Sequence, residues 1–170
     1  MAKTISKDTP LNELILRRYE KPYSLGKRDL VRKYCLSVGL LQPGDSRDIV
    51  VDILFALLLA RGEKKEMSSE EIKDVVIELR KAENLPLVGI APSNIRRQLK
   101  RLRDVMIAEK VKNSYRITEF SNLDEIFEQK LEQFLIPNMI QRIKEYHQRI
   151  DEEFRDINSG SVFNRDENNP

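Results

Sequence analysis

The stretch RDIVVDILFALLLARG, residues 47–62, constrains the fold of this chain more than any other part of the sequence. From Ile49 to Ala60 nearly every position is apolar, so a helix made from it has no polar face for solvent and has to be buried. The longest apolar run, Ile53–Ala60, is far shorter than the ~20 residues that a membrane span needs. We therefore predict a central core helix that Ser46 caps and Gly62 ends.

The first 45 residues are predicted to form an N-terminal helical extension. Thr9 and Pro10 have the residue types of an N-cap and a first helical position, which predicts a short helix starting here. A second helix is predicted over about Lys27–Ser37, and Gly39 follows where the residue after a helix often needs a left-handed conformation. The basic side chains of this extension are expected to be scattered surface charges, with phosphate contacts as the alternative. They include Arg17, Arg18, Lys27, Arg28, Arg32 and Lys33.

Two more helices are predicted after the core helix. An exposed connector, EKKEM, leads to a helix over residues 68–82 with Ser68 or Ser69 as its N-cap. The second is APSNIRRQLKRLRD, residues 91–104, which places its apolar and its basic residues on opposite sides. The apolar face, expected to dock on the core, consists of Ile95, Leu99, Leu102 and Met106. The other side carries Arg96, Arg97, Lys100 and Arg103, with Ser93 and Asn94 at the N-terminus.

The pattern changes after this basic helix. Ile107, Val111, Tyr115 and Ile117 predict two short strands, with Lys112-Asn113-Ser114 as the hairpin turn. Positive charge also concentrates here, because residues 92–119 contain eight basic and three acidic side chains, whereas the whole chain carries only +2. Charge gathered on one element is the kind that attracts an anionic partner.

A long helix is predicted from Asn122 or Asp124, interrupted or kinked at Pro137. Its apolar residues recur at steps of three and four, which is typical of a coiled-coil seam. We predict that this seam pairs with a second copy of the chain, with intramolecular docking as the alternative. The predicted dimer interface consists of Phe127, Leu131, Leu135, Met139, Ile143, Tyr146, Ile150 and Phe154. The predicted organisation is then an extension over residues 1–45, a domain over 46–120, a dimerisation helix over 121–157 and a disordered tail over 158–170.

The order of helix, helix, basic helix and two-stranded hairpin between residues 47 and 118 resembles a winged helix-turn-helix domain. The sequence APSNIRRQLKRLRDVMIAEKVKNSYRITEF carries this resemblance. With the long C-terminal helix, the chain is similar to PadR-like prokaryotic and archaeal transcription regulators. The resemblance implies a mainly α fold with a small β-hairpin.

The same resemblance implies double-stranded DNA as the partner of a homodimeric regulator that binds a specific sequence. Recognition helices read base edges near their N-termini while flanking basic residues hold phosphates, and paired helices in a dimer lie about 34 Å apart. The major-groove residues would be Ser93, Asn94, Arg96, Arg97 and Lys100, with Arg101 on a phosphate. The hairpin contact would come from Lys110, Lys112 and Asn113 at its tip and Arg116 on the return strand.

Three alternatives stay open at this point. The basic helix can be an ordinary solvated face, because Lys and Arg are good surface helix formers. The domain can be a protein-interaction module that does not bind DNA. It can also be a DNA-organising or plasmid-maintenance protein with little sequence preference, since phosphate contacts carry no sequence information.

Residues that could support catalysis or metal binding are few. Cys35 is the only cysteine and has no histidine near it in sequence, so a buried structural thiol is expected. His147 is the only histidine and neighbours the predicted coiled-coil seam. There is no glycine-rich phosphate loop and no metal-ligand spacing. We expect a cytoplasmic protein that is not an enzyme and uses no cofactor; a small-molecule effector is not readable.

Overall fold

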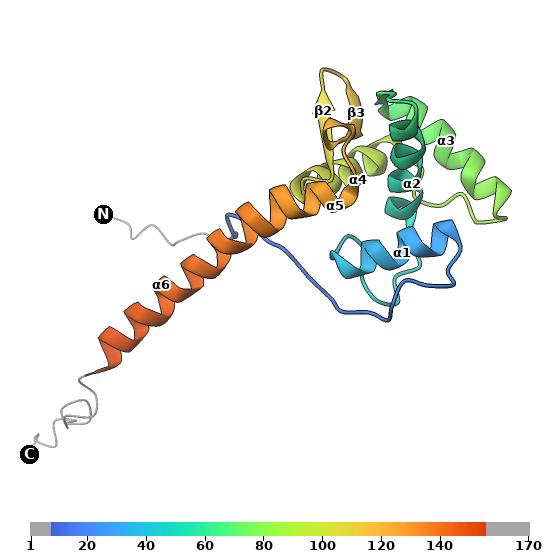
Figure 1. The fold of residues 1–170 in the computed structure, drawn as a ribbon. Helices are drawn as coiled ribbons and strands as arrows, with labels where there is room; N and C mark the ends of the chain where they lie inside the picture. Colours follow the sequence, from blue (N-terminus) through green and yellow to red (C-terminus); the bar gives the residue numbers. More distant parts are fainter. Residues whose placement is uncertain (1–7, 156–170) are drawn as a thin grey trace, which may run out of the picture.

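The computed structural model describes residues 8–155, which are mainly helical with a small three-stranded antiparallel sheet (Figure 1). Four helices and the sheet form one body, and a long C-terminal helix projects from it. The elements are α1 Lys27–Ser37, α2 Ile49–Gly62, β1 Met67–Ser68, α3 Ser69–Ala82, α4 Pro92–Asp104, β2 Ala108–Val111, β3 Ser114–Ile117, the 3-10 turn η1 Thr118–Phe120, α5 Leu123–Ile126, the π-helical segment η2 Phe127–Leu135 and α6 Ile136–Phe154.

Helix α2 lies at the centre of the body, as its composition predicts. Ile53, Leu54 and Leu57 are completely or almost completely buried, and α2 contacts α1, α3, α4 and β3. The helix ends at Gly62 as predicted, but Asp48, not Ser46, is the residue before its first turn. Asp48 makes no cap hydrogen bond because arginines from α1 and α3 occupy its carboxylate.

The helix-end signals of α1 and α3 are confirmed. Ser68 forms a capping box with Glu71: the Ser68 hydroxyl accepts from the Glu71 backbone N–H at 3.2 Å, and the Glu71 carboxylate accepts from the Ser68 backbone N–H at 2.8 Å. Gly39 follows the end of α1 with a φ of +73°. A Cβ there would lie 2.6 Å from the Cβ of Ile15, so both the backbone angle and the space require glycine.

The sheet has one strand more than the predicted hairpin. Its order is β1–β3–β2, with Met67 paired to Tyr115 and Ala108 paired to Ile117. The prediction that EKKEM is an exposed connector is wrong at Met67, whose side chain is 3% exposed and belongs to the core. A two-residue strand is too short to show an alternating pattern, so only its pairing with β3 reveals it.

The predicted helix at Thr9 and Pro10 is wrong, because residues 8–26 contain no helix. This segment, called here the N-terminal arm, is held at the end of α1 by Arg17. The Arg17 backbone N–H donates to the Ser37 carbonyl at 2.8 Å, and its guanidinium donates to the carbonyls of Leu36 at 2.8 Å and Leu41 at 3.2 Å. The last carbonyls of a helix have no partner within it. The arm supplies donors to two of them, at Leu36 and Ser37, and this tertiary gain overrides the local helix signal.

An ion network centred on the buried Asp52 and Arg80 joins α1, α2 and α3 and was not predicted. Asp52 accepts from Arg28 at 2.8 and 3.1 Å and from Arg80 at 2.5 Å, while Asp48 accepts from the same two arginines at 3.0 and 3.1 Å. Arg80 also donates to the carbonyl of Pro86, in the loop before α4, at 2.8 Å. Arg32 lies 3.7 Å from Asp48. Arg28 and Arg32 therefore stabilise the body instead of lying on it as scattered charges.

The C-terminal helix runs from α5 through η2 into α6. Leu135 and Ile136 keep helical backbone angles directly before Pro137, so the helix continues through the proline. Pro137 has no N–H to donate to the helix, and the wider π-helical segment η2 lies directly before it. Leu131 and Leu135 are 2% and 4% exposed, so the chain itself buries these two predicted dimer contacts. No residue of α6 is buried. The predicted disordered tail lies outside the described residues.

Candidate nucleic-acid interface

Helix α4 presents its basic side to solvent because its apolar side is anchored in the core. Ile95, Leu99 and Leu102 are fully buried, which fixes how the helix is rotated about its axis. The helix ends at Asp104, so the prediction that Met106 continues its apolar face is wrong. Met106 has a φ of +61° and turns the chain toward β2.

The exposed side of α4 carries Ser93, Arg96, Arg97, Lys100 and Arg103. Arg96 and Arg103 form no ion pair with any residue between 8 and 155. Lys100 pairs with Asp104 at 2.9 Å, but both side chains are mostly exposed and such pairs contribute little. The surface therefore holds positive charge that the described part of the chain does not neutralise.

Two of the predicted contact residues on α4, Asn94 and Arg101, make hydrogen bonds within the chain. The Asn94 amide nitrogen donates to the Gly89 carbonyl at 2.7 Å, and its oxygen accepts from Arg97 at 2.7 Å and Gln98 at 3.3 Å. The Arg101 guanidinium donates to the Leu40 carbonyl at 2.6 Å. These bonds hold the start of α4 to the loop before it and the middle of α4 to the loop after α1, which leaves Asn94 and Arg101 little freedom to contact a ligand.

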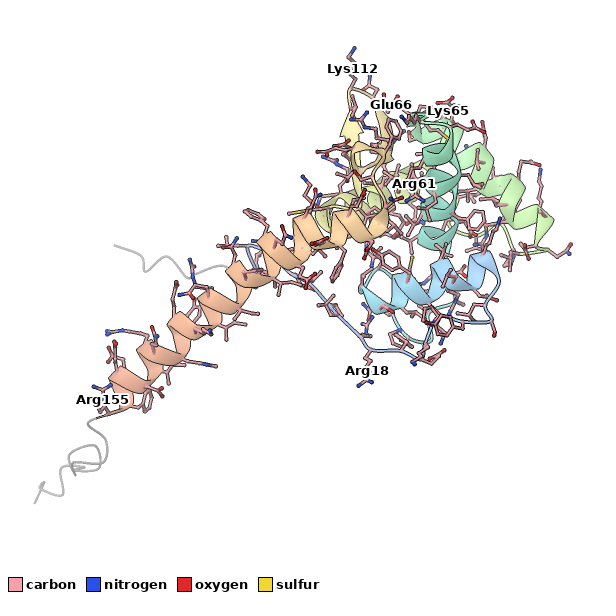
Figure 2. The ribbon with its side chains drawn as sticks, in the orientation of Figure 1. Arg18, Arg61, Lys65, Glu66, Lys112 and Arg155 are labelled. Carbon is pink, nitrogen blue, oxygen red and sulfur yellow. The ribbon has the colours of Figure 1, made fainter. Side chains whose placement is uncertain are left out.

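The hairpin of β2 and β3 projects beside α4, and Lys112 points away from the body at its tip (Figure 2). Its turn is the residue pair Lys112-Asn113, since Ser114 already begins β3. Lys110, Lys112 and Asn113 are exposed, and Lys110 lies 5.7 Å from the ring centre of Tyr115. Three of the four predicted hairpin residues are thus accessible.

The fourth, Arg116, lies within the sheet face and is neutralised there. It donates to Glu109 at 2.7 Å and Glu66 at 3.0 Å, and its guanidinium stacks 4.8 Å from the ring centre of Phe120. Partial burial tends to raise the pKa of Glu109. The Glu119 backbone N–H and the Arg116 guanidinium outweigh this effect and hold that pKa below its usual range. Arg116 therefore contributes to sheet stability.

A cleft of about 360 Å³ adjoins the N-terminal half of α4. Its lining includes Arg97, Arg101 and Arg47, the last from the loop before α2, and Asp45 is the single acidic residue of the lining. Arg47 is exposed and donates to Asp45 through its backbone N–H at 2.9 Å, a bond that lowers the pKa of the Asp45 carboxyl. No sequence signal points to Arg47, because an arginine in a polar turn is an ordinary surface residue until the fold places it beside α4.

Cysteine and histidine, which often carry other chemistry, each occur once in the chain, as Cys35 and His147. Cys35 is fully buried, and burial raises the pKa of its thiol to about 12, so the reactive thiolate is not formed at neutral pH. His147 is exposed on α6. Within residues 8–155 no group of three or more histidine, cysteine or acidic residues could hold a metal ion. Among the same residues, no helix has the length and apolarity to cross a bilayer.

Comparison of the chain with protein-family models, with curated proteins and with solved structures finds no match. The interpretation of the α4 and hairpin surface therefore rests on its residues and geometry.

Proposed function

We propose that the chain binds double-stranded DNA as a homodimeric transcription regulator of the winged helix-turn-helix type. The observation that carries the proposal is the exposed side of α4, where Arg96, Arg97, Lys100 and Arg103 lie together beside the projecting hairpin with Lys112 at its tip. Phosphate contacts supply much of the affinity of a protein for DNA, and they come from basic side chains on one face.

The order of elements also supports the proposal. Two helices, α2 and α3, precede the basic helix α4, and the strands β2 and β3 follow it, which is the order on which the resemblance to winged domains rests. The rigid core contacts of α4 would keep its exposed side in one orientation for docking. A DNA major groove is wide enough to admit one α-helix.

The contact residues divide by position. Ser93, Arg96 and Arg97 lie in the first turns of α4 and would reach base edges, since the N-terminal part of a recognition helix usually does so. Lys100 and Arg103 lie further along and would hold phosphates. Lys110, Lys112 and Asn113 would contact the adjacent backbone. Asn94, Arg101 and Arg116 are left out of this set because partly buried hydrogen bonds to backbone carbonyls or carboxylates occupy them, whereas the bond of Arg97 to Asn94 is exposed.

The test is fluorescence anisotropy of a labelled random-sequence duplex, titrated between about 50 and 200 mM salt, where phosphate contacts change affinity strongly. Each lost phosphate contact reduces the salt slope by about 0.9. Lys100→Ala and Lys112→Ala are each expected to do so, and the double variant to reduce it by about 1.8. Arg18→Ala is the control, because Arg18 lies on the N-terminal arm on the opposite side of the body from Lys112 (Figure 2).

The outcomes separate the open alternatives. No binding at about 50 mM salt would refute the proposal and turn the search to protein partners. Equal affinity for duplexes of different sequence would favour a DNA-organising protein over a regulator, because only base contacts discriminate sequences.

A further inference from the structure

Helix α6 carries an apolar face that the described part of the chain leaves uncovered. Five of its side chains are about half exposed or more: Ile140, Ile143, Tyr146, Ile150 and Phe154. Their spacing of three or four residues places them along one side of the helix. Figure 1 shows that α6 extends away from the body, so nothing on the body reaches its outer half.

The extent of this face suits an interface. At roughly 100 Å² of uncovered surface for each large side chain, the five expose on the order of 500 Å², as large as the apolar patches that usually have a function. Two such faces together give about 1,000 Å², close to the ~1,200 Å² at which specific interfaces begin. The stems of neighbouring charged side chains add to this area.

The charge along α6 changes sign between its halves. Residues 136–145 contain two basic and one acidic side chain, whereas residues 146–155 contain two basic and three acidic ones. A second copy lying antiparallel brings the positive half of one helix against the negative half of the other, twice. A parallel pair instead places the positive half against the positive half and the negative half against the negative half. With a net charge of +1 on one half and −1 on the other, after ion pairs such as Arg142–Glu145 and Arg149–Glu152 form within each half, the pattern favours an antiparallel second copy.

A groove at the start of α6 is a possible binding site for the C-terminal end of that second helix. It has a volume of about 530 Å³ and lies between Thr9–Asn12 of the N-terminal arm and the helix residues Met139, Ile143 and Tyr146. Leu11, on the arm side of the groove, is 91% exposed. An apolar side chain entering this groove would cover surface that both the arm and the helix leave open.

We infer that α6 pairs antiparallel with α6 of a second copy, and that the partner's Phe154 occupies the groove between the N-terminal arm and Met139. With the two-fold axis beside Tyr146 and His147, Ile143 faces the partner's Ile150, and the contact repeats symmetrically. The bodies then lie at opposite ends of the pair, separated by about the length of the 19-residue α6, roughly 28 Å. This arrangement rests on the homodimer proposed above, and its formation requires no DNA.

Light scattering on the full chain without DNA tests the pairing. The wild type is expected at twice the 19.9 kDa of one chain, and Ile143→Glu or Ile150→Glu at 19.9 kDa. Leu59→Glu is the matched control, since Leu59 is 53% exposed on α2 and Ile143 is 55% exposed on α6. Because these side chains are already half exposed, their substitution leaves the body folded. A monomeric wild type, or dimers that survive both α6 substitutions, would overturn the inference.

Disulfide trapping tests the orientation. In the antiparallel pair, a mixture of Ile143→Cys and Ile150→Cys chains cross-links, but neither variant alone does. Two copies of position 143 lie about 10 Å apart along the helix axis, beyond the ~7 Å between Cα atoms that a disulfide spans. In a parallel pair each variant cross-links with itself, and that result would refute the inference. Wild-type protein is the control, because its single thiol, Cys35, is buried.

The DNA titration and the trapping experiment fail independently. An antiparallel dimer without DNA affinity would leave this inference standing and refute the DNA-binding proposal. If the chain binds DNA but stays monomeric, DNA binding by the α4 surface is supported and the α6 pairing is refuted.

Discussion

The ion network around Asp52 joins three helices of the body, and removing this carboxylate tests how much the network stabilises the fold. Asp52 is 1% exposed and accepts hydrogen bonds from Arg28 and from Arg80, which is itself 3% exposed. Asp52→Ala leaves both guanidinium groups with Asp48 as their remaining carboxylate partner. The buried Arg80 and the partly exposed Arg28 would then share one negative charge, and water cannot replace the lost partner at Arg80.

Breaking a buried ion pair by removing one partner costs about 3–5 kcal/mol in free energy of unfolding. We expect a loss of this size for Asp52→Ala in urea unfolding followed by circular dichroism, and a smaller loss for Asp52→Asn, which keeps a hydrogen-bond acceptor in place. Asp104→Ala is the control, because its pair with Lys100 is exposed and such pairs contribute less than about 1 kcal/mol. A loss for Asp52→Ala no larger than that of the control would refute the reasoning.

Two further predictions concern acid stability and Gly39. Burial acts to raise the pKa of Asp48, but hydrogen bonds from Arg28 and Arg80 outweigh it and the pKa is lowered. The ionised Asp48 therefore stabilises the fold above its unfolded pKa, near 4, and this contribution is lost as pH falls below that value. The free energy of unfolding, measured as a function of pH in the acid range, should show the loss. A flat profile would contradict the prediction. Gly39→Ala should lower stability by about 1–3 kcal/mol because the backbone is left-handed there. Thermal melts measure both glycine variants, and Gly62→Ala, with open space around its Cβ, should be nearly neutral or stabilising.

The order of helices and the hairpin is readable from local signals. The apolar surface of α2, the Ser68 cap of α3 and the two-faced composition of α4 depend on neighbours within a few residues, so the sequence alone indicates them. The rotation of α4, with Ile95 and Leu99 inward, follows from the same spacing. The exposed basic side chains Arg96, Arg97 and Lys100 are therefore readable from the sequence alone.

Other features depend on residues far apart in the chain. The N-terminal arm is held extended because Arg17 donates to carbonyls at the end of α1, and β1 exists because Met67 pairs with Tyr115. Long-range contacts also decide whether a basic side chain is free to contact a ligand, since Arg101 and Arg116 hydrogen-bond partners 61 and 50 residues away.

The sequence by itself determined the helices of the body, the hairpin and the presence of a basic and an apolar helix face, because periodicity and end signals act over short range. Only the tertiary structure decided which charges stay free, that Leu131 and Leu135 are buried within one chain, and that the apolar face of α6 begins beyond them. The physical reason is that burial and ion pairing depend on tertiary contacts between residues far apart in the chain, which local sequence patterns do not specify.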